Sequence, residues 1–278
     1  MLEKKRWSKE VYEFLIGFLD QKPSLVAFDF DNTIIHGDFG DQVMWKLVEN
    51  ELLDIQKILD PLPEFFTEKN RKTILQSNPT ERVAEIQKIY HEIVEKHGMI
   101  KGYSWTSFLF SHLTESALLE FSRKLWNDNL QNYRQSPDAS PQFVSPYPEI
   151  LNLLENLQQK GFETYIVTSS PSLVIQATCE TIPVPKENVL GMDLQLDKSG
   201  RTTREIVEPY PCGEGKKTAL LKRAQRNPNL VFGDSWNDFG LFGASQNVIV
   251  IDRKLEGYRE AVQKFSPIFQ PRFVDVRS

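Results

Sequence analysis

Apolar residues repeat at intervals of three and four in the first part of the chain, which is the spacing of a helix with one buried face. Residues 8–21 show this pattern, and Ser8 is placed to cap the first turn. A second helix is expected from Asp41 onward, after the flexible stretch at 37–40. Between them a strand is predicted at residues 25–30, because this stretch begins with the apolar run 25–28, which is typical of a buried strand.

The helical pattern continues to about residue 140. Thr80 and Thr114 are placed to cap two more amphipathic helices. Residues 136–148 then carry four prolines, which is typical of a linker or boundary. We therefore expect residues 36–140 to form an inserted all-helical cap domain, and residues 1–35 and 141–278 to form the core domain.

After the proline-rich stretch, strands alternate with helices. Besides residues 25–30, strands are predicted at 163–168, 230–232 and 248–251, and helices at 171–181, 215–226 and 238–244. Residues 189–207 are predicted to form a hairpin that turns near Gly200. This alternation is typical of a parallel sheet with helices on both faces, so we expect an α/β, Rossmann-like core.

Composition and charge narrow the function. The chain has 278 residues, 40% of them hydrophobic and 26% charged, with a net charge of −5. This balance gives no basic surface for nucleic acid and no polybasic patch for a membrane. The charged N-terminus lacks the apolar core of a signal peptide, and Cys179 and Cys212 form no CxxC pair. We expect a cytoplasmic protein with reduced thiols, and a single disulfide between the two cysteines is the alternative.

Reactive side chains follow several predicted strands, and parallel strands present their carboxyl ends at one edge of the sheet. These residues are Asp29, Asp31, Thr168, Ser169, Ser170 and Asp234, together with Lys216 at the start of a helix. Asp29 and Asp31 leave the same side of a strand, where two carboxylates need a cation such as Mg²⁺. Each residue also has a structural alternative, such as a helix cap for Thr168 or a solvated surface for Lys216.

The set of groups suggests phosphoryl transfer. One carboxylate can act as the nucleophile and form an aspartyl-phosphate. A magnesium ion can neutralise charge, while a lysine and hydroxyl groups hold the phosphate oxygens. A second carboxylate can donate a proton to the leaving alcohol and later accept one from water.

Four sequence motifs carry a resemblance to a known family. In order, Asp29–Thr33, Ile166–Ser169, Lys216 and Gly233–Asp238 resemble the motifs of the haloacid dehalogenase-like superfamily. The helical insertion is similar to the cap of its phosphoserine phosphatase-like and phosphorylcholine phosphatase-like branch. The resemblance implies a phosphatase rather than a dehalogenase, because the dehalogenases lack the aspartate found here at Asp31.

The resemblance implies a role for each motif residue. Asp29 would be the nucleophile and Asp31 the general acid and base. The phosphate-binding residues would be Thr168, Ser169, Lys216 and Asn237. Mg²⁺ would be held by Asp29, the main-chain carbonyl of Asp31, and Asp234, and Asp238 would bind a metal water or orient Lys216.

Substrate choice is expected near the start of the insertion. Phosphoserine phosphatases carry a glutamate nine residues after the nucleophile, and Asp38 stands at that position, with Asp41 one turn further on. Three aromatic residues of the insertion would be able to cage a quaternary ammonium, although aromatic residues at such positions are more often part of a core; they are Trp45, Tyr103 and Trp105. For the phosphoserine-binding arginine of that branch, the insertion offers only Arg71 and Arg82 as candidates.

We therefore expect a Mg²⁺-dependent phosphatase acting on a small phosphorylated metabolite, with amine-bearing phosphomonoesters such as phosphoserine, phosphocholine or phosphoethanolamine among the candidates. A phosphotransferase that uses the same aspartyl-phosphate is the alternative among enzymes. The alternative outside enzymes is a non-catalytic regulatory or binding protein on the same fold. Neither nucleic acid nor membrane is expected as a partner.

Overall fold

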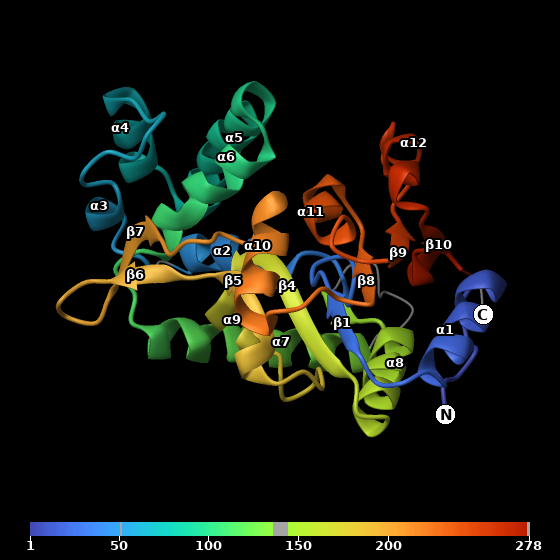
Figure 1. The fold of residues 1–278 in the computed structure, drawn as a ribbon. Helices are drawn as coiled ribbons and strands as arrows, with labels where there is room; N and C mark the ends of the chain where they lie inside the picture. The colour runs from blue at the N-terminus through green and yellow to red at the C-terminus, as the bar shows by residue number, and fades with distance from the viewer. Residues whose placement is uncertain (51, 136–143, 277–278) are drawn as a thin grey trace.

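The centre of the fold is one parallel sheet of six strands, seen in the computed structural model, which describes residues 1–50, 52–135 and 144–276 (Figure 1). In spatial order the strands are β10 (Ile268–Pro271), β9 (Asn247–Asp252), β8 (Leu230–Gly233), β1 (Leu25–Phe28), β4 (Glu163–Pro171) and β5 (Val189–Met192). The first strand along the chain, β1, lies between β4 and β8 and pairs with both in parallel. The predicted parallel sheet is therefore confirmed.

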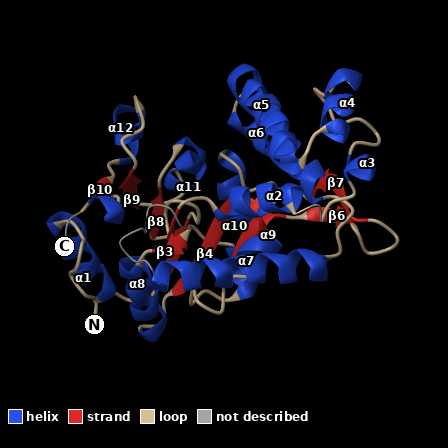
Figure 2. Cartoon of the chain, turned by 180° about the vertical axis from the view of Figure 1, so that it is seen from behind, coloured by secondary structure: helices blue, strands red, loops and turns tan. Residues whose placement is uncertain are grey.

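The two faces of the sheet are covered by different helices, because side chains alternate along each strand. Leu25 and Ala27 of β1 belong to a buried cluster with residues of α10 (Glu214–Ala224), α11 (Phe239–Phe242) and α12 (Tyr258–Ala261). Val26 and Phe28 belong to a second cluster with residues of α1 (Lys9–Leu19) and α8 (Pro148–Gln159). Figure 2 shows α8 and α1 from the side opposite to that of Figure 1. The Rossmann-like α/β fold is confirmed by this two-sided cover.

A helical segment is inserted between β1 and β4. Its helices are α2 (Phe39–Glu49), α3 (Ile55–Ile58), α4 (Glu68–Gln76), α5 (Pro79–His97), α6 (Met99–Trp105) and α7 (Glu115–Gln135), with a 3₁₀ turn at Thr106–Phe110. The helices α3 to α6 extend beyond one end of the sheet (Figure 1). Where the segment begins and ends, β2 (Ile35–His36) pairs with β3 (Ser145–Pro146). The division into core and cap stays a prediction, and its boundary at 140/141 lies outside the described residues.

The hairpin prediction for residues 189–207 is wrong in its first half. Residues 189–192 form β5, which joins the edge of the main sheet beside β4, because this apolar run is mostly buried. The hairpin itself is shorter and consists of β6 (Leu194–Leu196) and β7 (Thr202–Ile206). It lies against the inserted segment, where the Thr202 N–H donates to the Leu113 carbonyl at 2.9 Å and the Arg204 guanidinium contacts the Pro61 carbonyl.

Several predicted helix boundaries also differ. The cap of α5 is Asn78 rather than Thr80, because the Asn78 side chain accepts from the Glu81 N–H and Pro79 is tolerated in the first turn. The helix expected from Asp41 begins at Phe39, with Asp38 as its cap. The helix expected at 171–181 is reduced to α9 (Ser172–Gln176), since β4 extends to Pro171. The predicted Ser8 cap of α1 is confirmed.

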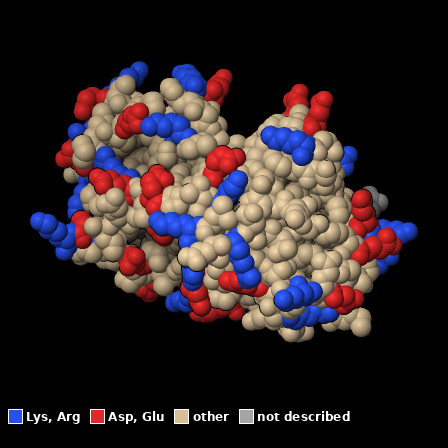
Figure 3. Space-filling model, viewed as in Figure 1, with Lys and Arg blue, Asp and Glu red and all other residues tan. Residues whose placement is uncertain are grey.

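The surface carries both signs of charge. Lysine and arginine side chains are interspersed with aspartate and glutamate over the face drawn in Figure 3. No helix in the described part of the chain is long and apolar enough to cross a membrane.

Phe28 tests how far the fold depends on the central strand. Its side chain is fully buried, and its ring stacks on that of Phe232 with centroids 4.5 Å apart. Phe28→Ala is expected to lower the free energy of unfolding by about 3–5 kcal/mol, because it removes apolar contact and leaves a cavity. The measurement is urea denaturation, with Phe65→Ala as the matched control.

Phe65 is 36% exposed, so its replacement by alanine is expected to cost less than about 1 kcal/mol. Similar losses in both variants would contradict the importance of β1 packing.

Candidate active site

A cavity of about 350 Å³ lies at the carboxyl ends of the central strands, between the sheet and the inserted helices. Most of the residues singled out from the sequence line it; they are Asp29, Asp31, Asp38, Asp41, Thr168, Ser169, Asp234 and Asn237. Lys216 and Asp238 lie behind this lining, with side chains 1% and 0% exposed. The fold therefore brings residues that are more than 200 positions apart to one site.

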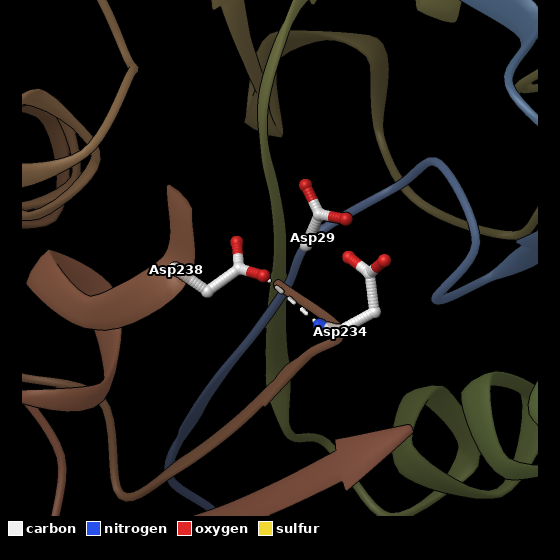
Figure 4. A group of neighbouring side chains, drawn as sticks. All are labelled: Asp29, Asp234 and Asp238. Carbon is white, nitrogen blue, oxygen red and sulfur yellow. Dashed lines mark hydrogen bonds between the residues drawn. The ribbon is translucent and has the colours of Figure 1, made fainter. Parts of the chain in front are cut away.

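Three buried carboxylates, which we call the acidic floor, lie together at the base of the site, two in the cavity lining and Asp238 behind it. Asp29 follows β1, Asp234 follows β8, and Asp238 comes from the next turn (Figure 4). One oxygen of each lies within 4.8 Å of the others. Burial raises the pKa of Asp29 to about 7, although Lys216 opposes the rise. Burial and the neighbouring carboxylates Asp29 and Asp238 also raise the pKa of Asp234.

Lys216 joins two of these carboxylates. Its Nζ lies 2.5 Å from Asp29 Oδ1 and 2.6 Å from Asp238 Oδ1. Burial by itself lowers the pKa of Lys216, but Asp238 and Asp29 raise it, so that the pKa lies above its usual value. The buried ammonium is therefore held in its charged form.

The other carboxylate oxygen of Asp238 binds the main chain of the loop after β8. Asp238 Oδ2 accepts from the main-chain N–H groups of Asp234 and Ser235, at 2.9 and 3.0 Å. A side chain at Gly233 would meet this carboxyl group, since a Cβ there would lie 2.6 Å from Asp238 Cγ. These contacts favour the predicted role of Asp238 in orienting Lys216. Direct or water-mediated metal binding by Asp238 stays a prediction.

Asp31 lies beside Asp29 in a different environment. Its Oδ1 accepts from the Phe39 N–H at 2.7 Å, and its Oδ2 accepts from the Ser170 hydroxyl at 2.6 Å. Burial and the nearby Asp38 raise the pKa of Asp31 to about 7, while these two hydrogen bonds oppose the rise. A carboxyl group with such a pKa can carry or release a proton near neutral pH.

A polar network connects the ends of β4 and β8 with the loop before α10. The Asn237 side chain donates to Ser169 Oγ at 2.6 Å and accepts from the Gly213 N–H at 2.6 Å. Thr168 Oγ1 accepts from the Ser170 N–H at 3.1 Å. Asn237 therefore fixes Ser169 relative to the start of the helix that carries Lys216.

Two further carboxylates lie on the inserted side of the cavity. Asp38 caps α2 by accepting from the Asp41 N–H at 2.8 Å. Burial and Asp41 raise the pKa of Asp38 to about 8, and burial and Asp31 raise that of Asp41 to about 6. Within the described residues, neither carboxylate forms an ion pair.

The proposed aromatic cage is not assembled. Of its three members only Tyr103 lines the cavity. Trp105 is buried and donates to the Glu64 carbonyl, while Trp45 packs near Tyr90. Arg71 and Arg82 also lie outside the cavity lining, and Arg82 donates to the carbonyls of Ile74 and Ser77 at the end of α4. Neither arginine therefore supplies a cavity cation.

Sequence reasoning placed Ser170 at the strand end with Thr168 and Ser169 but gave it no role, and it missed Arg253. Ser170 holds Asp31, and Arg253 donates to Asp234 Oδ2 at 2.7 Å. Arg253 directly follows β9, so the rule that reactive residues follow parallel strands could have found it after the predicted strand at 248–251.

The donor set of the site fits a hard divalent cation. Asp29 and Asp234 offer carboxylate oxygens and, with Asp238, form a buried acidic group whose mutual repulsion a cation would relieve. Oxygen ligands of this kind are those that Mg²⁺ prefers. The residues present therefore fit the predicted magnesium.

Known proteins resemble this chain in family and in fold. A model of the haloacid dehalogenase-like hydrolase family matches residues 26–242. No curated protein matches the chain.

Several solved structures share the fold at low sequence identity. A conserved, functionally unknown protein from Anaerococcus prevotii is 16% identical, with 95% of this chain and 91% of that chain covered and a TM-score of 0.69. A HAD family hydrolase from Salmonella enterica serovar Typhi is 14% identical, with 94% and 77% covered and a TM-score of 0.54. A probable phosphoserine phosphatase from Vibrio cholerae is 12% identical, with 93% and 67% covered and a TM-score of 0.51. At these identities the likeness concerns the fold alone.

Proposed function

This chain belongs to the haloacid dehalogenase-like hydrolase family, and on that premise we propose that it is a magnesium-dependent phosphatase of small phosphorylated metabolites. The observation that carries the proposal is the buried contact of 2.5 Å between Lys216 Nζ and Asp29 Oδ1, with Asp31 at the same strand end. The nucleophile Asp29 and the proton carrier Asp31 then line one cavity, and the fixed cation Lys216 lies directly behind Asp29. These are the groups that hydrolysis through an aspartyl-phosphate requires.

Asp29 is the proposed nucleophile. Lys216 contacts its Oδ1, and the Thr33 hydroxyl donates to its Oδ2 at 3.1 Å. Both contacts favour the ionised carboxylate and fix its orientation. Attack on phosphorus would form the aspartyl-phosphate and release the alcohol, and water would then hydrolyse the acyl phosphate.

Asp31 is the proposed general acid and base. Its hydrogen bonds from Phe39 and Ser170 fix its position at the cavity wall. In the first step it would donate a proton to the leaving oxygen, and in the second it would accept one from the attacking water.

The phosphate oxygens are proposed to bind on the β4 side of Asp29. Thr168 and Ser169 line the cavity there, and Asn237 supports Ser169. Lys216 would add its positive charge from behind. Such donors stabilise the charge of the transferring group because they are already oriented before the reaction.

Magnesium is the proposed cofactor. Asp29, the main-chain carbonyl of Asp31, and Asp234 would hold it, with Asp238 in support. When bound, it would neutralise charge on the phosphate and on the acidic floor.

Asp38 and Asp41 are proposed to select an amine-bearing substrate. Both line the cavity, and burial disfavours their charged forms in the absence of a cation. The ammonium or quaternary ammonium group of a small phosphomonoester would compensate these charges.

The role of Asp29 is tested by Asp29→Asn. Hydrolysis of p-nitrophenyl phosphate is expected to fall by about 10³-fold or more, because an amide cannot serve as the nucleophile. Release of p-nitrophenol measures it, and Asp20→Asn, which alters a carboxylate 73% exposed in its side chain, is the control. Activity retained in Asp29→Asn would exclude this nucleophile, and an inactive wild-type protein across a panel of phosphomonoesters would favour a non-catalytic role.

Removal of metal gives a second test. EDTA is expected to abolish phosphatase activity, because the acidic floor then lacks the cation that neutralises the phosphate. Addition of MgCl₂ in excess of the chelator is expected to restore it, as followed by phosphate release. A reaction rate that does not respond to chelator would refute the magnesium site.

Substrate selection is tested by Asp38→Asn, which removes the charge but keeps an oxygen that can cap α2. We expect kcat/KM to fall by about tenfold or more for phosphocholine, phosphoethanolamine or phosphoserine, and to change little for p-nitrophenyl phosphate. Asp41→Asn is the companion variant. An equal loss of kcat/KM for the amine-bearing substrates and for p-nitrophenyl phosphate would argue against selection at this position.

A further inference from the structure

Arg253 occupies one side of the acidic floor. It directly follows β9, and its Nη1 donates to Asp234 Oδ2 at 2.7 Å. The Asp234 side chain is 4% exposed, whereas that of Arg253 is 32% exposed. A cation that is open to the cavity thus pairs with a carboxylate that is almost fully enclosed.

The cavity lining is strongly acidic. Five carboxylates line it, and among the described lining residues Arg253 is the single side chain with a positive charge. Those carboxylates are Asp29, Asp31, Asp38, Asp41 and Asp234. Lys216 compensates Asp29 and Asp238 from behind and does not contact Asp234 through any described ion pair. The charge of Asp234 is therefore compensated chiefly by Arg253.

We propose that Arg253 is a displaceable counter-ion, which holds Asp234 while the metal is absent and leaves it when Mg²⁺ binds. The inference rests on the magnesium site of the proposed function. Mg²⁺ requires carboxylate oxygens at about 2.0–2.1 Å, so it competes with the guanidinium for the oxygens of Asp234. The two cations also repel each other at such short range.

The two cations of the site differ in their freedom to move. Lys216 is 1% exposed and is held by two carboxylates. Arg253 has one described carboxylate partner and a long side chain that reaches the cavity. Metal binding therefore displaces Arg253 and leaves Lys216 in place. If Arg253 only oriented Asp234 as a ligand, its removal would weaken Mg²⁺ binding instead, because loss of such a partner weakens metal binding about 10–100-fold.

The test is titration of MgCl₂ into chelator-treated, desalted protein by isothermal calorimetry, without substrate. Arg253→Gln keeps a hydrogen-bond donor but removes the charge, and we expect it to bind Mg²⁺ about tenfold or more tightly than the wild type. Arg253→Met is the second variant and is expected to change affinity in the same direction. Arg253→Lys keeps the charge and is expected to stay closer to the wild type.

Arg259→Gln is the matched control. It makes the same change in net charge, but Arg259 is 66% exposed and lies 3.4 Å from Asp252 rather than at Asp234. Its Mg²⁺ affinity is expected to stay within about twofold of the wild type, because exposed charges are screened by solvent and salt.

Thermal unfolding gives a second readout. In EDTA, Arg253→Gln is expected to melt at a lower temperature than the wild type, because Asp234 has lost its counter-ion. Mg²⁺ is expected to raise the melting temperature of the variant more than that of the wild type. A variant that folds only with Mg²⁺ would support the proposal in the strongest form.

Unchanged or weaker Mg²⁺ binding in Arg253→Gln and Arg253→Met, with wild-type binding intact, would overturn the role of Arg253 alone. Absence of Mg²⁺ binding in the wild type and in both variants would overturn the magnesium site and this inference together. Phosphatase activity is not used in either measurement, so the two failures are distinguishable.

Discussion

The buried ammonium of Lys216 is the interaction on which the site depends. Its contacts with Asp29 and Asp238 connect the end of β1 to the turn after β8, and α10 supplies the lysine. Removing one partner of such a buried pair typically costs about 3–5 kcal/mol, because the remaining charge has no water to solvate it. The positions of α10, of the ends of β1 and β8, and of Gly233 therefore depend on one another.

Much of the core could be predicted from the sequence, because the apolar runs of β1, β8 and β9 are short, continuous and followed by polar residues. The same reasoning identified the family, which is confirmed by the match over residues 26–242. Prediction failed where pairing with a distant strand, rather than the local sequence pattern, determines the structure. The sequence pattern predicts residues 189–192 as half of a hairpin, yet they pair with β4. The edge of the main sheet buries these apolar residues more fully than a local hairpin would.

Prediction of the site from the sequence has the same limit. Spacing along the chain could indicate that Asp29, Asp31 and Asp234 belong to one edge, but it carries no information on hydrogen-bond partners. The sequence places Ser170 at a strand end beside Thr168 and Ser169, but no pattern there indicates that it donates to Asp31. For Trp105 the sequence leaves both a cage position and a core position open, and only the packing of the inserted helices shows that its ring is buried.

The order of the strands has a consequence for how the chain folds. β1 precedes the other strands of the sheet along the chain and lies between β8 and β4, but its partner residues begin at Glu163 on one side and Leu230 on the other. Such distant pairing makes folding slow, since a long loop must close before its contacts form. Until then both edges of an apolar strand stay open to other chains, and early folding intermediates are exposed to aggregation.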